Sequence, residues 1–278
     1  MSEFATLLSD LVLVESPRWH DDRLVFSDWG AGEVIALDLD GKHAVVARIS
    51  AMPFCLDRLP DGRMLVVAGQ QLLVRQADGT LSTYAHLEQI STKPWNDIVC
   101  DGRGNTYVNN IGFDFPDGEF APGLIALANP DATVHQVADG LAFPNGMAVT
   151  PDNSTLIVAE SYGGVLTAYD IAADGGLSGR RIWADLHGGA PDGICIDAEG
   201  AVWFAEVPGR RCVRVNEGGE VLETIASDLG CFACTLGGPA GTTLFATAAG
   251  WPDAMTPGSR TGKILAAEVS VPRAGWPG

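Results

Sequence analysis

The stretch GMAVTPDNSTLIVAE, residues 146–160, contains two short apolar runs separated by a turn rich in Pro, Asp and Asn at 151–153. Two further runs follow, LTAYDI at 166–171 and RRIWAD at 180–185, with glycine-rich turns between them. Short apolar runs bounded by turn residues are typical of β-strands. This part of the chain therefore predicts a unit of four short antiparallel strands.

The same plan recurs along the chain. Six units begin with matching short motifs whose first residues lie 39, 42, 49, 47 and 40 positions apart: Glu15-Ser-Pro-Arg, Phe54-Cys-Leu-Asp, Asn96-Asp-Ile-Val, Asn145-Gly-Met-Ala, Asp192-Gly-Ile-Cys and Phe232-Ala-Cys-Thr. After each start comes an apolar run: LVFSD, LVVAG, YVNNI, LIVAE, VWFAE and LFATA. A repeat of about 40–45 residues built from short strands is typical of a β-propeller blade. We therefore predict one all-β domain over residues 1–278, a six-bladed β-propeller with four strands per blade and very little helix.

The sixth unit lacks a fourth strand, because the chain ends in Pro- and Gly-rich residues after KILAAEV. A spare apolar segment, Phe4-Ala-Thr-Leu-Leu, precedes the first unit. We expect residues 3–8 to form the outer strand of the last blade, which ties the chain ends together and removes an open sheet edge.

Composition excludes some classes of partner. The net charge is −18 and the sequence pI is about 4.4, which argues against nucleic acid and against an anionic membrane surface. The start Met1-Ser-Glu-Phe is acidic and no run approaches the roughly 20 apolar residues of a membrane-spanning helix. We expect a cytoplasmic protein with reduced thiols, in which Cys231 and Cys234 are small buried residues rather than a zinc or redox motif.

A propeller places equivalent positions of its repeats in a ring around one axis. Four of the six positions are Glu15, Asn96, Asn145 and Asp192, which supply two carboxylates and two amide oxygens. Oxygen-only ligation predicts one divalent cation, with Ca²⁺ the first choice and Mn²⁺, Fe²⁺, Mg²⁺ or Zn²⁺ as alternatives. Taken singly, the Asn-Gly and Asp-Gly pairs would also be ordinary turn formers.

Other residues near this ring are candidates for contacting a substrate. Phe54 and Phe232 occupy the remaining ring positions and would form either an apolar wall or a plug in the central channel. Trp95 precedes Asn96 and would lie at the mouth or pack between blades. Asn109 ends a second strand on the same face and is a candidate substrate contact. Two long loops, 112–123 and 250–262, lie on this side and are candidate lids.

The chain resembles the SMP-30/gluconolactonase/luciferin-regenerating-enzyme family over nearly its whole length. The resemblance rests on four stretches: ESPRW (15–19), WNDIVCDGRGNTYVNN (95–110), FPNGMAVTPDNSTLIVAES (143–161) and APDGICIDAEGAVWFAEV (190–207). It implies a six-bladed propeller and a divalent metal held by Glu15, Asn145 and Asp192. It also implies that Asn96 lies beside the metal as a substrate-binding or fourth-ligand residue and that Asp192 is the general base.

One departure from the family concerns the substrate. Some sugar-lactone members carry an Arg two residues before the Asn that matches Asn96, whereas this chain has Pro94 there. The change leaves room for a less polar ester or lactone. We therefore expect a metal-dependent hydrolase that opens a small-molecule lactone, with Asp192 activating water. The alternatives are a phosphotriesterase on the same metal and a non-catalytic propeller with a structural cation. No feature of the sequence indicates which lactone is used or the oligomeric state.

Overall fold

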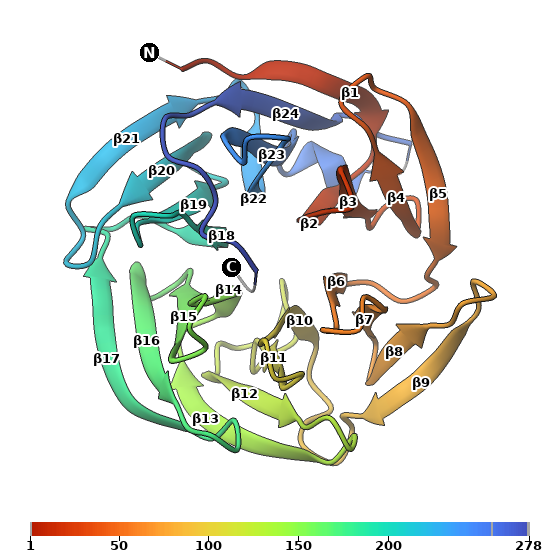
Figure 1. The fold of residues 1–278 in the computed structure, drawn as a ribbon, viewed down its shortest axis with the longest axis vertical. Coiled ribbons are helices and arrows are strands. Elements are labelled where there is room, and N and C mark those ends of the chain that lie inside the picture. The colour runs from red at the N-terminus through yellow and green to blue at the C-terminus, as the bar shows by residue number, and fades with distance from the viewer. Residues whose placement is uncertain (1, 257, 277–278) are drawn as a thin grey trace.

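The computed structural model describes residues 2–256 and 258–276, and in this part of the chain 24 strands form six four-stranded antiparallel sheets. The sheets are arranged as blades around a central axis (Figure 1). This six-bladed β-propeller is the fold that the repeat predicted. The described residues contain one helical turn, the 3-10 helix η1 (Asp253–Met255), and no helix long and apolar enough to cross a membrane.

Each blade runs from an inner strand at the axis to an outer strand at the rim. The first three blades are β2 (Val14–His20), β3 (Arg23–Asp28), β4 (Glu33–Leu37) and β5 (His43–Arg48); β6 (Phe54–Arg58), β7 (Met64–Ala68), β8 (Gln71–Arg75) and β9 (Leu81–His86); and β10 (Trp95–Cys100), β11 (Thr106–Asn110), β12 (Gly123–Ala128) and β13 (Val134–Leu141).

The next two blades follow the same plan, and the last one combines both chain ends. They are β14 (Pro144–Val149), β15 (Thr155–Glu160), β16 (Val165–Ile171) and β17 (Leu177–Asp185); β18 (Pro191–Ile196), β19 (Val202–Glu206), β20 (Arg211–Val215) and β21 (Val221–Ala226); and β22 (Gly230–Gly237), β23 (Thr243–Ala249), β24 (Gly262–Glu268) and β1 (Ala5–Leu11).

The N-terminal strand closes the last blade, as predicted, but it spans Ala5–Leu11 and not residues 3–8. In β1, Ala5 pairs with Ala266 and Leu11 pairs with Gly262 of β24. Phe4 packs against the apolar core between the fifth and sixth blades. The strand therefore covers an edge that would otherwise expose unpaired backbone groups.

Burial falls from the axis to the rim. The first two strands of the third blade, β10 and β11, are buried along their whole length, whereas most residues of the outer strand β13 are exposed or half-buried. The apolar core lies between neighbouring blades; for example, Leu65 and Leu72 of the second blade pack with Trp95 and Val108 of the third. Because the inner strands are packed closely around the axis, a polar residue buried there requires a local partner.

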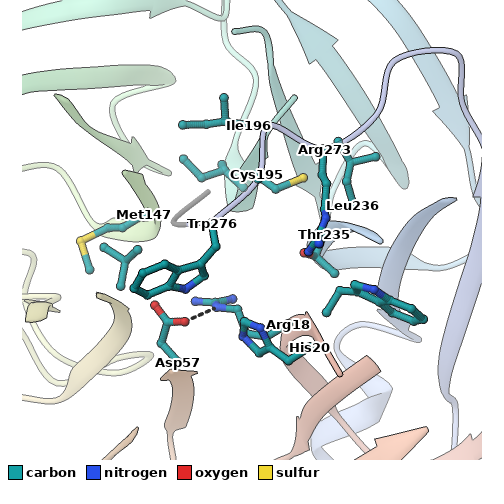
Figure 2. A pocket seen from close by; sticks show the side chains of 14 residues that line it. Arg18, His20, Asp57, Met147, Cys195, Ile196, Thr235, Leu236, Arg273 and Trp276 are labelled. Carbon is teal, nitrogen blue, oxygen red and sulfur yellow. Dashed lines mark ion pairs between the residues drawn. The ribbon is translucent and has the colours of Figure 1, made fainter. Parts of the chain in front are cut away.

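The central channel is covered at the end away from the predicted ring. The C-terminal segment crosses it, held by the backbone N–H of Arg273 donating to Gly241 (2.9 Å) and that of Ala274 donating to Ile196 (3.2 Å). Figure 2 shows Trp276 above Arg18 and Asp57, which line a cavity of about 30 Å³. A cavity of that size is too small for more than a few water molecules, so this end of the channel is nearly filled.

Candidate metal and active site

The first residues of the inner strands meet at the open end of the channel, and most of them lie in irregular backbone. The pairing register shifts between Glu15 and Arg18, Trp95 and Ile98, Pro144 and Met147, Pro191 and Ile194, and Cys231 and Ala233. Bulges of this kind re-aim side chains and are common beside functional sites. In a regular strand, successive side chains point to opposite faces of the sheet. At these register shifts that alternation is interrupted, so the side chains point in other directions.

Glycine follows two of the site residues because neighbouring inner strands approach closely at the axis. A β-carbon on Gly146 would lie 2.6 Å from the backbone of Asp192 and Gly193, and one on Gly193 would lie 2.2 Å from the β-carbon of Ala233. Asn145-Gly146 and Asp192-Gly193 lie within β14 and β18, not in turns. The structure thus rejects the turn interpretation of these two dipeptides.

Asp192 is the least satisfied polar group of the site. Its Oδ1 atom is buried and has no hydrogen-bond partner among the described residues. Burial raises the pKa of Asp192 well above its usual range, and the nearby charges of Glu15 and Asp97 raise it further. Hydrogen bonds from the Asn145 side chain and the Gly193 backbone oppose this effect. A buried carboxylate oxygen without a partner is the donor that a bound cation would satisfy.

Glu15 is the second carboxylate at this end and is 6% exposed. Its Oε2 atom accepts a hydrogen bond from the Ser16 backbone N–H at 2.6 Å. Burial raises the pKa of Glu15 to about 8, with Asp97 adding to the effect and both the Ser16 hydrogen bond and Arg18 opposing it. Each of these two buried carboxylates disfavours ionisation of the other. Both can be ionised at once only if a positive charge lies beside them.

The two amide residues are joined to each other and to the next blade. Asn96 Nδ2 donates to Asn145 Oδ1 at 3.3 Å, and Asn145 Nδ2 donates to Ser161 Oγ at 3.3 Å. The Ser161 hydroxyl in turn donates to the carbonyl of Pro191 at 2.7 Å. Because an amide oxygen has two lone pairs, Asn145 Oδ1 retains an acceptor position for a cation. Ser161 was not among the site residues predicted from the sequence.

These donors fit a hard divalent cation. Glu15 and Asn145 line a cavity of about 10 Å³, and the donors at this end are two carboxylates and two amides. No group of three His, Cys, Asp or Glu residues able to hold a metal occurs in the described part of the chain. The candidate ligands differ from such a group because two of them are neutral asparagine side chains. Carboxylate and amide oxygens suit Ca²⁺ or Mg²⁺ better than zinc.

A buried charge network lies below the site. Arg18 Nη2 is 3.5 Å from Asp97 Oδ1, and Arg18 Nε is 3.6 Å from Asp57 Oδ1. Asp97 also accepts from the Met147 backbone at 2.9 Å, and Asp57 accepts from the Cys100 backbone at 2.7 Å. None of these three residues was predicted from the sequence as part of the site. The signal available was the charged side chains within the predicted inner strands, because charged residues are rarely buried unless they are paired.

The predicted substrate contacts lie in different surroundings. Trp95 is 2% exposed, and its indole N–H donates to Gln70 Oε1 at 3.0 Å, so it packs between blades, the second of its two expected roles. Phe54 is completely buried, and the β6 register is continuous from this residue onward. Asn109 is also completely buried and bonds to backbone groups of the site. Phe232 is 7% exposed and lies edge-on to Trp251, with ring centroids 5.9 Å apart.

The loops expected as lids begin at this end of the channel. Asn110, the last residue of β11, pairs with Trp95, and Ala249, the last residue of β23, pairs with Gly230. Loops 112–123 and 250–262 therefore leave the blades beside the site; their movement stays a prediction. All six cysteines are free and buried, as expected for small core thiols.

The fold and its buried oxygen donors define a six-bladed propeller with a polar central site. A family model described as "SMP-30/Gluconolactonase/LRE-like region" matches residues 13–250, so the chain belongs to this family. This finding confirms the resemblance derived from the sequence motifs.

Two relatives differ in the activity that their names state. Pentonolactonase XacC of Haloferax volcanii is 28% identical over 255 residues, which cover 86% of this chain and 82% of that protein. Diisopropyl-fluorophosphatase of Loligo vulgaris is 29% identical over 197 residues, 61% of each chain. The structure of a calcium-binding protein, regucalcin from Agrobacterium tumefaciens, is 22% identical with a TM-score of 0.81, and the match covers 98% of this chain and 96% of that one. That structural likeness shows the fold.

Proposed function

We propose that this protein hydrolyses a lactone at the open end of the channel, with a divalent cation held by Glu15, Asn145 and Asp192 and with Asn96 beside it. The buried, unpaired Oδ1 atom of Asp192 next to a second buried carboxylate carries this proposal. The lactonase relative supports the reaction class. Ca²⁺ is the first cation to test, because a protein of the same fold is described as calcium-binding.

Asp192 is the candidate general base. Its carboxylate accepts a proton from the water that attacks the lactone carbonyl carbon, and the ring C–O bond then breaks. The proton passes from Asp192 to the leaving ring oxygen, so that the product is an open-chain hydroxy acid. An aspartate that also holds a cation is a weaker base than a free one, because the positive charge favours its carboxylate form, so in this proposal the cation would also have to lower the pKa of the attacking water.

The amides have an orienting role in this proposal. Asn96 and Asn145 are held by their mutual hydrogen bond and by Ser161, so their positions are preorganised before the substrate binds. When bound, the cation would supply Lewis-acid polarisation of the substrate carbonyl.

A second candidate is hydrolysis of a phosphotriester at the same site. The diisopropyl-fluorophosphatase relative favours it, since the same donors would serve attack at phosphorus. A non-catalytic propeller with a structural cation is the third alternative, and it would show cation binding without turnover.

The test begins with chelator-treated protein reloaded separately with Ca²⁺, Mn²⁺, Mg²⁺, Fe²⁺ and Zn²⁺. Each form is assayed against short lactones and against activated phosphotriesters, and cation content is measured by elemental analysis. Lactone turnover that returns with one cation supports the proposal. Turnover of phosphotriesters alone would replace it with the second candidate, and stoichiometric cation without any turnover would favour the third.

A further inference from the structure

Five aromatic rings gather at the open end of the propeller, and we call them the aromatic cluster: Phe113, Phe115, Phe120, Phe143 and Tyr162. Phe113 is at the centre, with ring centroids 5.7 Å from both Phe120 and Phe143 and 6.1 Å from Tyr162. The Phe143 and Tyr162 rings are 4.8 Å apart. Only Phe113 is buried within the cluster, whereas Phe115, Phe120 and Tyr162 are 41%, 50% and 58% exposed.

The aromatic cluster lies on the amide side of the candidate site. The Phe143 carbonyl accepts from the Ser161 N–H at 3.0 Å, and the Ser161 hydroxyl accepts from Asn145 at 3.3 Å. Phe113 follows Asn110, which pairs with Trp95, the residue before Asn96. Two connections thus join the rings to the elements that carry Asn96 and Asn145.

Two polar contacts involve Asp114, in the loop that carries three of these rings. Lys93 Nζ lies 2.6 Å from Asp114 Oδ2, and the Gly118 N–H donates to the Asp114 carbonyl at 2.5 Å. The contacts between the rings, together with these two interactions, hold the rings as one group. Soluble proteins rarely expose several neighbouring aromatic side chains to water, and exposed apolar patches of this kind commonly bind ligands.

The chemistry of this surface selects the kind of substituent it would bind. The side chains of the aromatic cluster offer one polar group, the Tyr162 hydroxyl, so they provide little for the hydroxyls of a sugar. Exposed Asp117 and Glu119 lie on the same loop and would repel an anionic group. An uncharged hydrocarbon chain is the group that gains most from contact with these rings.

We propose that the aromatic cluster is a subsite for an uncharged hydrocarbon substituent on the substrate, so that this protein prefers alkyl lactones to polyhydroxylated sugar lactones. This inference rests on the proposed lactone hydrolysis. It assigns Phe120 and Tyr162 a role in specificity and leaves the hydrolytic groups unchanged.

The test compares three substrates with the same reloaded protein: γ-valerolactone, γ-nonalactone and D-galactono-1,4-lactone. Phe120→Ala and Tyr162→Ala are the variants, because both side chains are exposed and neither belongs to the proposed hydrolytic groups. Ile182→Ala on β17 is the matched control, since it removes an exposed apolar side chain (67% exposed) from the rim of the fourth blade.

We expect kcat/KM for γ-nonalactone to exceed that for the other two substrates. Each cluster variant should lower it about tenfold or more, chiefly through KM, while turnover of γ-valerolactone and the Ile182→Ala control stay unchanged. Equal kcat/KM for the short and long alkyl lactones, or variants with no effect on their ratio, would overturn the subsite while leaving lactone hydrolysis intact. A change of oligomeric mass in the variants without any change in that ratio would make the surface a contact between proteins and also overturn it.

Binding of 2-pentylcyclopentanone, a ketone that cannot be hydrolysed, separates this inference from the proposed function. Calorimetry should show tighter binding than for cyclopentanone in the wild type, and the difference should shrink in Phe120→Ala. If no lactone is turned over but this difference is observed, the proposed hydrolysis is wrong and the apolar subsite stands. If neither turnover nor binding is observed, both are wrong.

Discussion

The side-chain amide of Asn109 donates to the backbone carbonyl of Asn145 at 2.5 Å, which joins the second strand of one blade to the inner strand of the next. The Oδ1 atom of the same side chain accepts from the Asp97 backbone N–H at 3.1 Å. Asn109 is completely buried, so it positions the two amide residues of the site from below and has no exposed surface with which to contact a substrate.

Replacing Asn109 with Ala should destabilise the protein and weaken cation binding together. The variant leaves the Asp97 N–H and the Asn145 carbonyl without these partners in a buried setting, at a cost of about 1–3 kcal/mol each. Thermal unfolding and calorimetric titration with Ca²⁺ measure the two effects. Gln136→Ala, at an exposed position on β13, is the control and should change neither. An unaltered cation affinity in folded Asn109→Ala would argue against the positioning role.

Glu15→Gln should reduce cation binding while retaining the fold. The amide has nearly the same shape as the carboxylate but removes one of the two negative charges, and ligand charge is a main determinant of affinity for hard cations. We expect affinity for Ca²⁺ to fall by about tenfold or more, measured by titration and by the metal content of the purified protein. Glu217→Gln, an exposed position, is the matched control. Full stoichiometry with unchanged affinity in Glu15→Gln would remove Glu15 from the ligand set.

Asp192→Asn should lose turnover even when the cation site is saturated. The amide keeps an oxygen donor of the same shape but cannot accept the proton from water, and general-base catalysis contributes about 10²- to 10⁴-fold. Steady-state rates of lactone hydrolysis at saturating cation measure this loss. Asp185→Asn, at an exposed residue that ends β17, should retain wild-type rates. A near wild-type rate for saturated Asp192→Asn would limit Asp192 to a role as ligand.

We expect the protein to lose stability in acid because of His20, which lies at the covered end of the channel (Figure 2). Burial lowers the pKa of His20 from 6.5 to about 4, with Arg58 and Arg18 adding to the shift. Between these two values the unfolded chain binds more protons at this residue than the native protein does. The free energy of unfolding therefore rises with pH in this window. The contribution of His20 to it falls progressively as pH is lowered from about 6.5 to about 4.

The measurement is urea unfolding at several pH values for the wild type and for His20→Gln. The difference between the two proteins in free energy of unfolding reports on His20 alone. As pH falls from 6.5 to 4, the wild type should lose more stability than His20→Gln does. His135→Gln, at an exposed position, controls for loss of a histidine. Parallel curves for wild type and His20→Gln across this window would contradict the prediction.

Removing residues 1–9 should lower the melting temperature, because it leaves most of β24 as an exposed edge and uncovers apolar side chains. Leu7 and Leu8 pack against the core between the last and first blades. Removing residues 1–3 alone keeps β1 and is the control. Thermal unfolding and light scattering measure stability and association. The same melting temperature for both truncated proteins would show that β1 adds little to closure.

The periodic sequence was sufficient to predict the blades and their closure. Turn residues flank strand runs such as TLIVAE (155–160), and a motif that recurs every 39–49 residues admits few arrangements, so the propeller followed from local patterns. The same periodicity places Glu15, Asn96, Asn145 and Asp192 at equivalent positions, and the structure brings them to one end of the channel.

Only the tertiary structure determined where each side chain at these positions points. Phe54 and Phe232 are equivalent in the repeat, yet β6 is regular and buries Phe54 completely, whereas β22 has a register shift at Phe232. Such shifts depend on how closely neighbouring inner strands approach at the axis, as at Gly146 and Gly193, and no local pattern records that distance. The ion pairs between Arg18 and its aspartates likewise join residues 39 and 79 positions apart, and only packing around the axis brings them together.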